Sequence, residues 1–153
     1  MGRRTDRTSV KDERGFTLIE LMAVILIVAV LMVIALPTLL GARTRAYDRA
    51  AQSDVRNAFA AEKAYYTDTL TYTTNPVLMT AIEPAITYLA GDTPLATGVA
   101  YLDLEPVTNT VYVSAESISG MCWYLREIDG GGARFAADAA CGAADTQAYT
   151  NAW

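Results

Sequence analysis

The chain has 153 residues, which allows one small folded domain beside any targeting or membrane segment. It carries 17 acidic and 12 basic side chains, and residues 16–153 alone hold fourteen acidic and seven basic ones, a net charge of −7. This balance argues against general nucleic-acid binding, in which Lys and Arg neutralise phosphates. Histidine, a Gly-x-Ser-x-Gly motif and a Gly-rich phosphate loop are absent, so we expect no enzyme. A membrane-anchored enzyme that works with carboxylates alone stays open as another class.

The first fifteen residues are polar and highly charged, with five basic and three acidic side chains. They show no apolar periodicity. We therefore expect residues 1–15 to be disordered or to serve as a targeting leader.

An apolar segment follows at residues 16–42, in which Glu20 is the only charged side chain among 27 residues. A helix needs about 20 apolar residues to cross a bilayer of about 30 Å. The segment is longer than a signal-peptide core of about 7–15 residues, and no clean small-x-small cleavage site follows it. The pattern predicts a retained transmembrane helix, and the flanking Lys and Arg residues slightly favour an N-terminus on the cytoplasmic side.

Glu20 needs an explanation within that segment. An ionised carboxylate at the centre of a bilayer costs roughly 2.5–3.5 kcal/mol. Either Glu20 pairs with a cation, or it lies near the membrane edge and reaches water.

Residues 43–66 have the pattern of an amphipathic helix. They are rich in Ala and contain no Gly or Pro, and Pro37 and Gly41 are the only helix breakers between residues 16 and 66. We therefore predict one continuous helix over residues 16–66 with a kink at Pro37. The positions that recur at helical spacing are 47, 51, 55, 58/59, 62 and 65/66, all apolar except Glu62.

Basic residues also lie on this helix, and their side chains admit two interpretations. They form a solvated face beside Asp48 and Asp54, which we favour, or they contact anionic headgroups or DNA. These residues are Arg43, Arg45, Arg49 and Arg56.

The rest of the chain predicts a small sheet. Residues 67–98 contain three Pro and two Gly and indicate a connecting loop with a short helical turn at 77–82. Strand patterns follow at residues 99–104, 110–114, 122–128 and 134–135, with a turn at 129–132 and a tail at 138–153. Their close succession predicts an antiparallel sheet, one face of which packs on the apolar side of residues 47–66. Four aromatic side chains are expected to be core or packing residues rather than a binding cage, namely Trp123, Tyr124, Phe135 and Trp153.

The two cysteines, Cys122 and Cys141, lie in the distal third of the chain. An even pair in a small domain beyond a membrane span indicates a disulfide formed in an oxidising compartment, and two unpaired buried thiols are the alternative. Asp129, Asp138 and Asp145 lack the dense alternation of oxygen ligands that a calcium loop requires. We therefore expect no metal site and no cofactor.

The segment RGFTLIE at residues 14–20 resembles the processing signal of type IV prepilins. The resemblance rests on the charged leader, Gly15 before Phe16, Glu as the fifth residue after the glycine, and the distance to Pro37. It implies that a prepilin peptidase cuts after Gly15, that Phe16 is N-methylated, and that the apolar helix remains as the filament core. It further implies that Glu20 pairs with the N-terminal amine of a neighbouring subunit during assembly.

The resemblance implies a structural function, that of a pilin subunit in a type IV pilus, or fimbrium, for adhesion, twitching motility or DNA uptake. The expected partners are copies of the chain itself, the prepilin peptidase and methyltransferase, and the assembly platform in the cytoplasmic membrane. The expected location is that membrane for the precursor, as a single-pass chain with its N-terminus inside, and then the cell surface. A type II secretion pseudopilin and a minor pilin that acts as a tip adhesin are the alternatives.

The expected fold class is α+β, a long N-terminal helix packed on a small antiparallel sheet head with a C-terminal disulfide loop. The expected divisions are a cleaved leader at 1–15, an apolar helix at 16–42, an amphipathic helix at 43–66, a connecting loop at 67–98, and the sheet with the disulfide region at 99–153.

Overall fold

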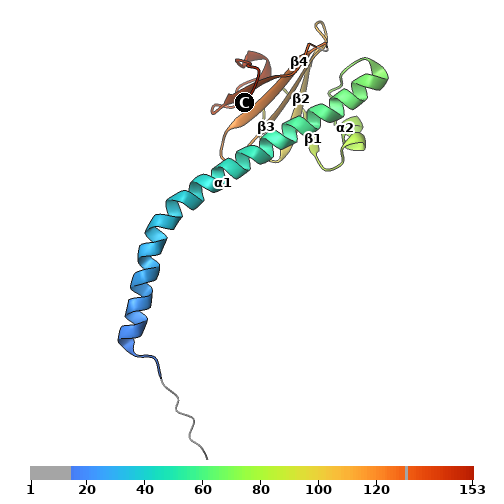
Figure 1. The fold of residues 1–153 in the computed structure, drawn as a ribbon. Coiled ribbons are helices and arrows are strands. Elements are labelled where there is room, and N and C mark those ends of the chain that lie inside the picture. Colours follow the sequence, from blue (N-terminus) through green and yellow to red (C-terminus); the bar gives the residue numbers. More distant parts are fainter. Residues whose placement is uncertain (1–14, 130) are drawn as a thin grey trace, which may run out of the picture. The chain divides into compact units, whose positions relative to one another are not determined.

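A computed structural model describes residues 15–129 and 131–153. The predicted leader, apart from Gly15, therefore lies outside the described residues, as does Gly130 of the predicted turn. Internal contacts divide the chain between Leu40 and Gly41. The part before this division is helical, and the part after it contains the rest of the helix and the whole sheet (Figure 1).

The predicted long helix is confirmed as α1, Leu18–Thr69. It stays helical through Pro37, whose missing N–H leaves the carbonyl of Val33 without its usual intrahelical donor. The kink at Pro37 stays a prediction. The helix ends where Leu70 takes a left-handed conformation with φ of 58° and donates its N–H to the carbonyl of Tyr66 over 2.8 Å.

The described strands form one sheet, and the α+β fold class is confirmed. Strands adjacent in sequence are adjacent in space, in the order β1-β2-β3-β4-β5, and the pairs from β2 to β5 are antiparallel as predicted. The strands are β1 Thr87–Ala90, β2 Val99–Glu105, β3 Thr110–Glu116, β4 Cys122–Ile128 and β5 Arg134–Asp138.

Strand β1 corrects two expectations. It lies within residues 67–98, which we interpreted as a loop, and it pairs with β2 in parallel, so the sheet is mixed. Only Tyr88 of its four residues is buried, and Pro84 and Gly91 border it closely. So short a run between turn residues has no distinct strand pattern, and its stability comes from pairing with β2.

The short turn predicted at residues 77–82 is confirmed as helix α2, Pro76–Ile82. Asn75 caps it by accepting the N–H of Val77 over 3.0 Å, and Pro76 occupies the first helical position.

The C-terminal part of α1 packs on one face of the sheet. Its buried residues are Ala51, Val55, Ala58, Ala61 and Glu62, which confirms positions 51, 55, 58 and 62 of the predicted stripe. Tyr47 is 40% exposed and does not belong to the buried stripe. The sheet residues in this core include Ala100, Leu102, Val111, Val113, Ala115 and Leu125.

The opposite face of the sheet is covered by the C-terminal segment, which we predicted only as a tail. A second buried cluster comprises Tyr112, Cys122, Tyr124, Ala136 and Ala144. The predicted disulfide between Cys122 and Cys141 is confirmed, and the short 3₁₀ helix η1, Ala144–Thr146, follows it. Closing a loop with a sequence separation of 19 stabilises the fold by about 3 kcal/mol in the chain-entropy model.

The predicted packing role of the aromatic residues is confirmed. Tyr124 is fully buried, and three partly buried rings, Trp123, Phe135 and Trp153, meet at the edge of the core that faces α1. The guanidinium of Arg56 stacks over the ring of Trp153 at 4.8 Å. Arg56 therefore packs against the head and is not merely solvated, as we had interpreted it.

Candidate functional site

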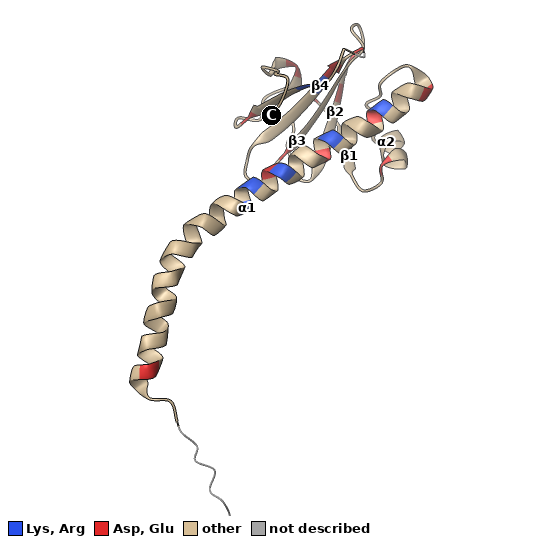
Figure 2. Ribbon diagram, in the orientation of Figure 1, with Lys and Arg blue, Asp and Glu red and all other residues tan. Residues whose placement is uncertain are grey.

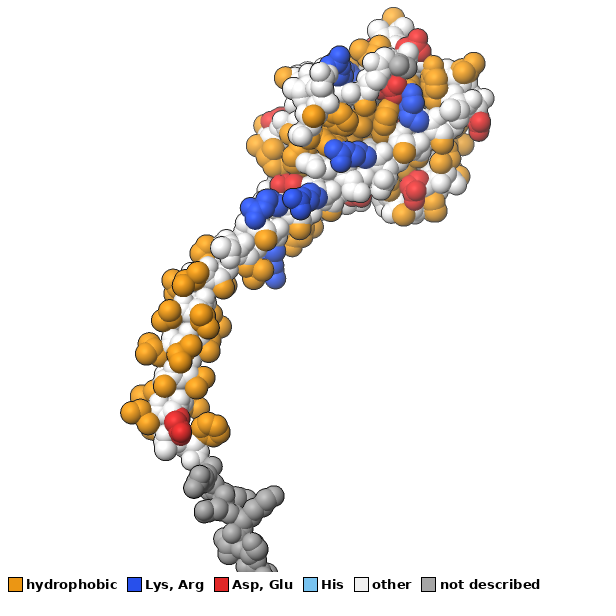
Figure 3. Space-filling view, viewed as in Figure 1, with side chains coloured by type: hydrophobic (Ala, Val, Ile, Leu, Met, Phe, Trp, Pro, Cys, Tyr) orange, Lys and Arg blue, Asp and Glu red, His pale blue; other side chains and the backbone are white. Residues whose placement is uncertain are grey.

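The part of the chain before Gly41 exposes its side chains along its whole described length. Every residue from 15 to 40 is exposed, and the large apolar side chains there range from 42% exposed at Val28 to 87% at Phe16. Figure 3 shows hydrophobic side chains along this part of the helix, and the ribbon in Figure 2 is tan there except at one acidic position. In the sequence, Glu20 is the only charged residue between residues 15 and 40. A soluble monomer rarely exposes so large an apolar surface, so this segment requires lipid or protein around it.

By length and composition, α1 qualifies as a membrane span, with a mean hydropathy of 3.1 in its most apolar window. It is the only such helix in the described part of the chain. A signal sequence near an N-terminus passes the same test, so the span alone does not identify the function.

Glu20 has a local partner that sequence reasoning missed. Its Oε2 accepts the backbone N–H of Thr17 over 2.9 Å and the hydroxyl of Thr17 over 2.7 Å, and the Thr17 hydroxyl in turn accepts the N–H of Glu20 over 3.2 Å. This reciprocal arrangement is a capping box, which satisfies backbone donors at the first turn of α1. The signal was in the sequence, as Thr-x-x-Glu directly before an apolar run.

The capping box leaves Glu20 able to bind a further group. Both recorded bonds of the carboxylate go to Oε2, and no described residue donates to Oε1. An ionised carboxylate has about four acceptor positions. Glu20 can therefore hold Thr17 and accept a cation at the same time.

The predicted processing residues lie at the exposed end of the helix. Gly15 and Phe16 precede α1 and are both exposed. A Cβ atom added at Gly15 would meet no other atom within 4 Å, so the fold does not itself require glycine there. Any requirement for glycine at this position therefore comes from a partner.

The predicted assembly residues are not brought together in one cluster. Pro37 lies seventeen positions after Glu20 on the continuous helix, which at 1.5 Å per residue is about 25 Å. The candidate site thus extends along α1, and a partner that contacts all of these residues must be similarly elongated.

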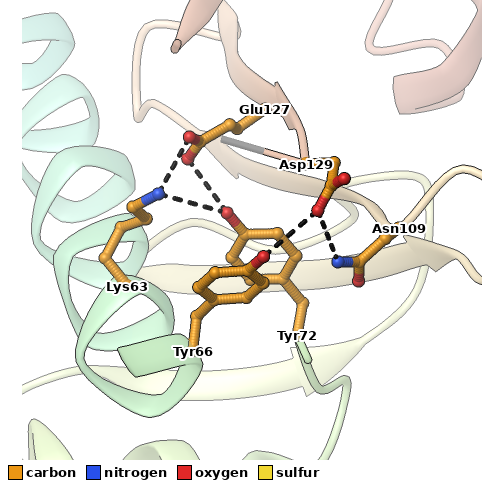
Figure 4. A network of polar contacts seen from close by, with 6 residues as sticks. All are labelled: Lys63, Tyr66, Tyr72, Asn109, Glu127 and Asp129. Carbon is orange, nitrogen blue, oxygen red and sulfur yellow. Dashed lines mark hydrogen bonds and ion pairs between the residues drawn. The ribbon is translucent and has the colours of Figure 1, made fainter. Parts of the chain in front are cut away.

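A polar network joins the end of α1 to the sheet (Figure 4). Lys63 Nζ lies 2.8 Å from Glu127 Oε1, and the hydroxyl of Tyr72 donates to Glu127 Oε2 over 3.1 Å. Glu127 is only 3% exposed, so its charge depends on these partners. The hydrogen bond to Glu127 raises the pKa of Lys63, and burial raises the pKa of Tyr72 to about 12.

A second branch of this network lies nearer the surface. Asp129 Oδ1 accepts the hydroxyl of Tyr66 over 3.1 Å and the side-chain amide of Asn109 over 3.2 Å. The rings of Tyr66 and Tyr72 stack with centroids 4.6 Å apart. These contacts fix the last turns of α1 on the head and hold no open position for a substrate.

Glu62 lies on the buried face of α1 with no exposed surface. Its Oε2 accepts the N–H of Thr73 over 3.2 Å, and its Oε1 has no hydrogen-bond partner among the described residues. Burial raises the pKa of Glu62 to about 7, while the hydrogen bond from Thr73 opposes this shift. The carboxyl group is therefore partly protonated near neutral pH.

The acids considered for calcium have other partners. Asp129 belongs to the network above, and Asp138 accepts the N–H groups of Ala140 and Gly142, which lowers its pKa. In residues 15–129 and 131–153, no three His, Cys, Asp or Glu side chains gather in a way that could hold a metal ion.

Comparison with known proteins agrees with the N-terminal pattern. The family described as the prokaryotic N-terminal methylation motif matches residues 10–36. Over 72 residues the chain is 36% identical to the type IV wide pilus major component PilA4 of Thermus thermophilus. The match covers 47% of this chain and 55% of that protein, so the chain spans about half the length of the curated relative it matches. Together these findings confirm the resemblance to type IV pilins.

Proposed function

We propose that this type IV pilin-like chain is a structural subunit that polymerises into a surface filament through the exposed apolar half of α1. The observation that carries the proposal is the uninterrupted exposure of residues 15–39, an apolar surface that the described residues do not cover. Lipid surrounds this surface in the precursor, and neighbouring copies of the same helix surround it in the filament. The methylation motif and the pilus component among its relatives support this interpretation.

Processing prepares the helix for assembly. A prepilin peptidase cuts between Gly15 and Phe16, the new amine of Phe16 is methylated, and the leader is removed. Cleavage by this peptidase requires the N-terminus of the chain to lie on the cytoplasmic side of the membrane. The exposed position of both residues at the end of the helix leaves the peptide bond accessible.

The new amine gives Glu20 a second partner. The Phe16 amine of a neighbouring subunit binds the carboxylate oxygen that Thr17 leaves available, and the pairing sets the axial register of the two helices. Such a buried pair is favourable only when both charges are present, since a lone charge in an apolar interior costs several kcal/mol. Pro37 lowers the cost of local unwinding, because the carbonyl of Val33 already lacks its helical donor.

The head remains outside the filament core. Its disulfide and its two-sided core hold the sheet together in an oxidising compartment. The partners are copies of the chain, the peptidase and methyltransferase, and the assembly platform of the membrane. The filament serves adhesion, motility or DNA uptake.

The proposal is tested by the location of the chain in cells that assemble type IV pili. We expect the parent chain in both washed membranes and sheared surface material. Gly15→Val should remain in membranes with its leader attached, and since the fold has room for a side chain there, its loss from the surface would report on cleavage. Uncleaved Gly15→Val in the sheared material would contradict the proposal. A cleaved parent chain confined to membranes would instead indicate a type II secretion pseudopilin.

A further inference from the structure

Two arginines lie side by side on adjacent strands, on the face of the sheet opposite α1. Arg126 of β4 is the register partner of Arg134 of β5. Side chains alternate between faces along a strand, and the neighbours of Arg126 on its face include Tyr124, which belongs to the cluster covered by the C-terminal segment. Like charges directly opposite in an antiparallel pair are destabilising.

Neither arginine forms an ion pair with a carboxylate of the described residues. In residues 15–129 and 131–153, one ion pair is present, and it joins Lys63 to Glu127. Glu127 lies on the other face of the sheet, the one that α1 covers. The nearby acids Asp129 and Asp138 are bound by other groups, and Asp145 is exposed on η1 without an ion pair.

The two guanidinium groups are held in place by other contacts. The ring of Tyr149 lies 4.5 Å from the Cζ atom of Arg126, and the Tyr149 hydroxyl donates to the carbonyl of Ala144 over 2.8 Å. Arg134 donates to the side-chain oxygen of Asn151. The Nε atom of Arg126 is buried and has no hydrogen-bond partner among the described residues.

Both arginines line the same hollow. It has a volume of about 360 Å³, and its lining is completed by Ile128, Gly131, Gly132 and Tyr149. An oriented guanidinium presents parallel N–H donors that match the oxygens of a carboxylate or phosphate. The hollow thus combines two cations that form no ion pair among the described residues with space for a group beside them.

We propose that this hollow is an anion-binding site, in which Arg126 and Arg134 together bind one phosphate or carboxylate group. The anion neutralises the facing charges and accepts N–H donors from both guanidinium groups, while Tyr149 keeps Arg126 oriented. Neither the assembly of α1 nor the processing of the N-terminus requires this site.

The test uses the full chain in detergent micelles, titrated with sodium phosphate against sodium chloride of equal ionic strength. We expect saturable binding of one phosphate per chain by calorimetry. Arg126→Gln and Arg134→Gln should each weaken binding at least tenfold, and Arg49→Gln, an exposed arginine on α1, should leave it unchanged. A parallel titration with sodium acetate separates phosphoryl groups from carboxylates as the natural ligand.

The stability of the variants provides a second measurement. Arg134 is exposed, so its replacement should leave the core intact. Without phosphate, Arg134→Gln should unfold at the same temperature as the parent or a higher one, because the substitution removes a repulsive charge. Phosphate should then raise the unfolding temperature of the parent and not that of this variant. If neither anion binds the parent more strongly than chloride does, or if Arg134→Gln keeps the parent's affinity, the proposal is wrong.

Discussion

Residues 18–40 and 41–69 belong to the same helix, but their side chains have different surroundings. In the first half every side chain is exposed, and its turns are closed by backbone bonds and by the capping box of Thr17 and Glu20. In the second half a stripe of small side chains is buried against a sheet. An amphipathic stripe can be buried within one chain, whereas a helix that is apolar on all sides requires surroundings that residues 15–129 and 131–153 do not provide.

The largest expected effect comes from placing one charge in each half. Val55→Asp introduces a carboxylate where the parent side chain is fully buried, and should destabilise the head by about 4 kcal/mol or more. Leu31→Asp, in the exposed half, should leave thermal unfolding of the head unchanged but weaken membrane insertion by about 3 kcal/mol. Thermal unfolding in micelles and membrane fractionation measure the two effects. Equal loss of head stability in both variants would contradict the distinction between the halves.

The next largest effect concerns the buried half of α1, where Glu62 should make the free energy of unfolding depend on pH. Because the pKa of Glu62 is raised from 4.5 to about 7 in the folded chain, the unfolded chain loses this proton at lower pH than the folded chain does. The stabilising effect of the protonated group is complete below pH 4.5 and is lost as pH rises towards 7. We expect Glu62→Gln to remove this dependence, a difference on the order of 3 kcal/mol at pH 8. Denaturant unfolding at several pH values measures the free energy of unfolding of the parent and of Glu62→Gln. If both depend on pH in the same way, ionisation of Glu62 does not destabilise the folded chain and the prediction is wrong.

A smaller effect concerns the network that anchors the end of α1. Lys63→Met leaves the carboxylate of Glu127 buried with Tyr72 as its remaining recorded partner. We expect a loss of about 2 kcal/mol in the free energy of unfolding. Tyr66→Phe is the matched control, because it removes only a bond to the exposed Asp129 and should cost about 0.5 kcal/mol or less. If the two variants lose the same stability, the ion pair is not the principal anchor.

The smallest effect tests the exposed half at its first turn. Thr17→Val removes the hydroxyl that bonds Glu20 and should weaken the first turn by about 1 kcal/mol, while Thr17→Ser should retain it. Hydrogen exchange at the amides of residues 19–21 in micelles reports this local opening. Unchanged exchange in Thr17→Val would mean that Glu20 does not depend on the capping box.

Features with a strong local pattern could be predicted from the sequence. The helix predicted over residues 16–66 corresponds to α1 within three residues at each end, although Pro37 and Gly41 lie inside it. The buried position of Glu62 follows from its spacing relative to Val55 and Ala58. Strands β2 to β4 follow from apolar and β-branched runs bounded by turn residues. Cys122 and Cys141 were the only pair available.

The remainder depends on contacts between distant residues. Strand β1 is too short to have a pattern of its own, and its parallel pairing is set by tertiary packing. The cover that the C-terminal segment provides for the second face rests on Tyr149 and Ala144, which have no distinctive periodicity. The facing arginines become neighbours only through the register of β4 and β5. In the candidate site, Gly15, Phe16 and Glu20 came from a motif, whereas the capping role of Thr17 was missed although its Thr-x-x-Glu signal is present in the sequence.

We propose that other copies of the chain cover the exposed half of α1 after cleavage, and the intact mass of the chain in sheared surface material tests this proposal. We expect a chain that begins at methylated Phe16 and is two hydrogens lighter than the reduced form, because of the bond between Cys122 and Cys141. A surface chain that still begins at Met1, or one cut beyond Ala42, would contradict it.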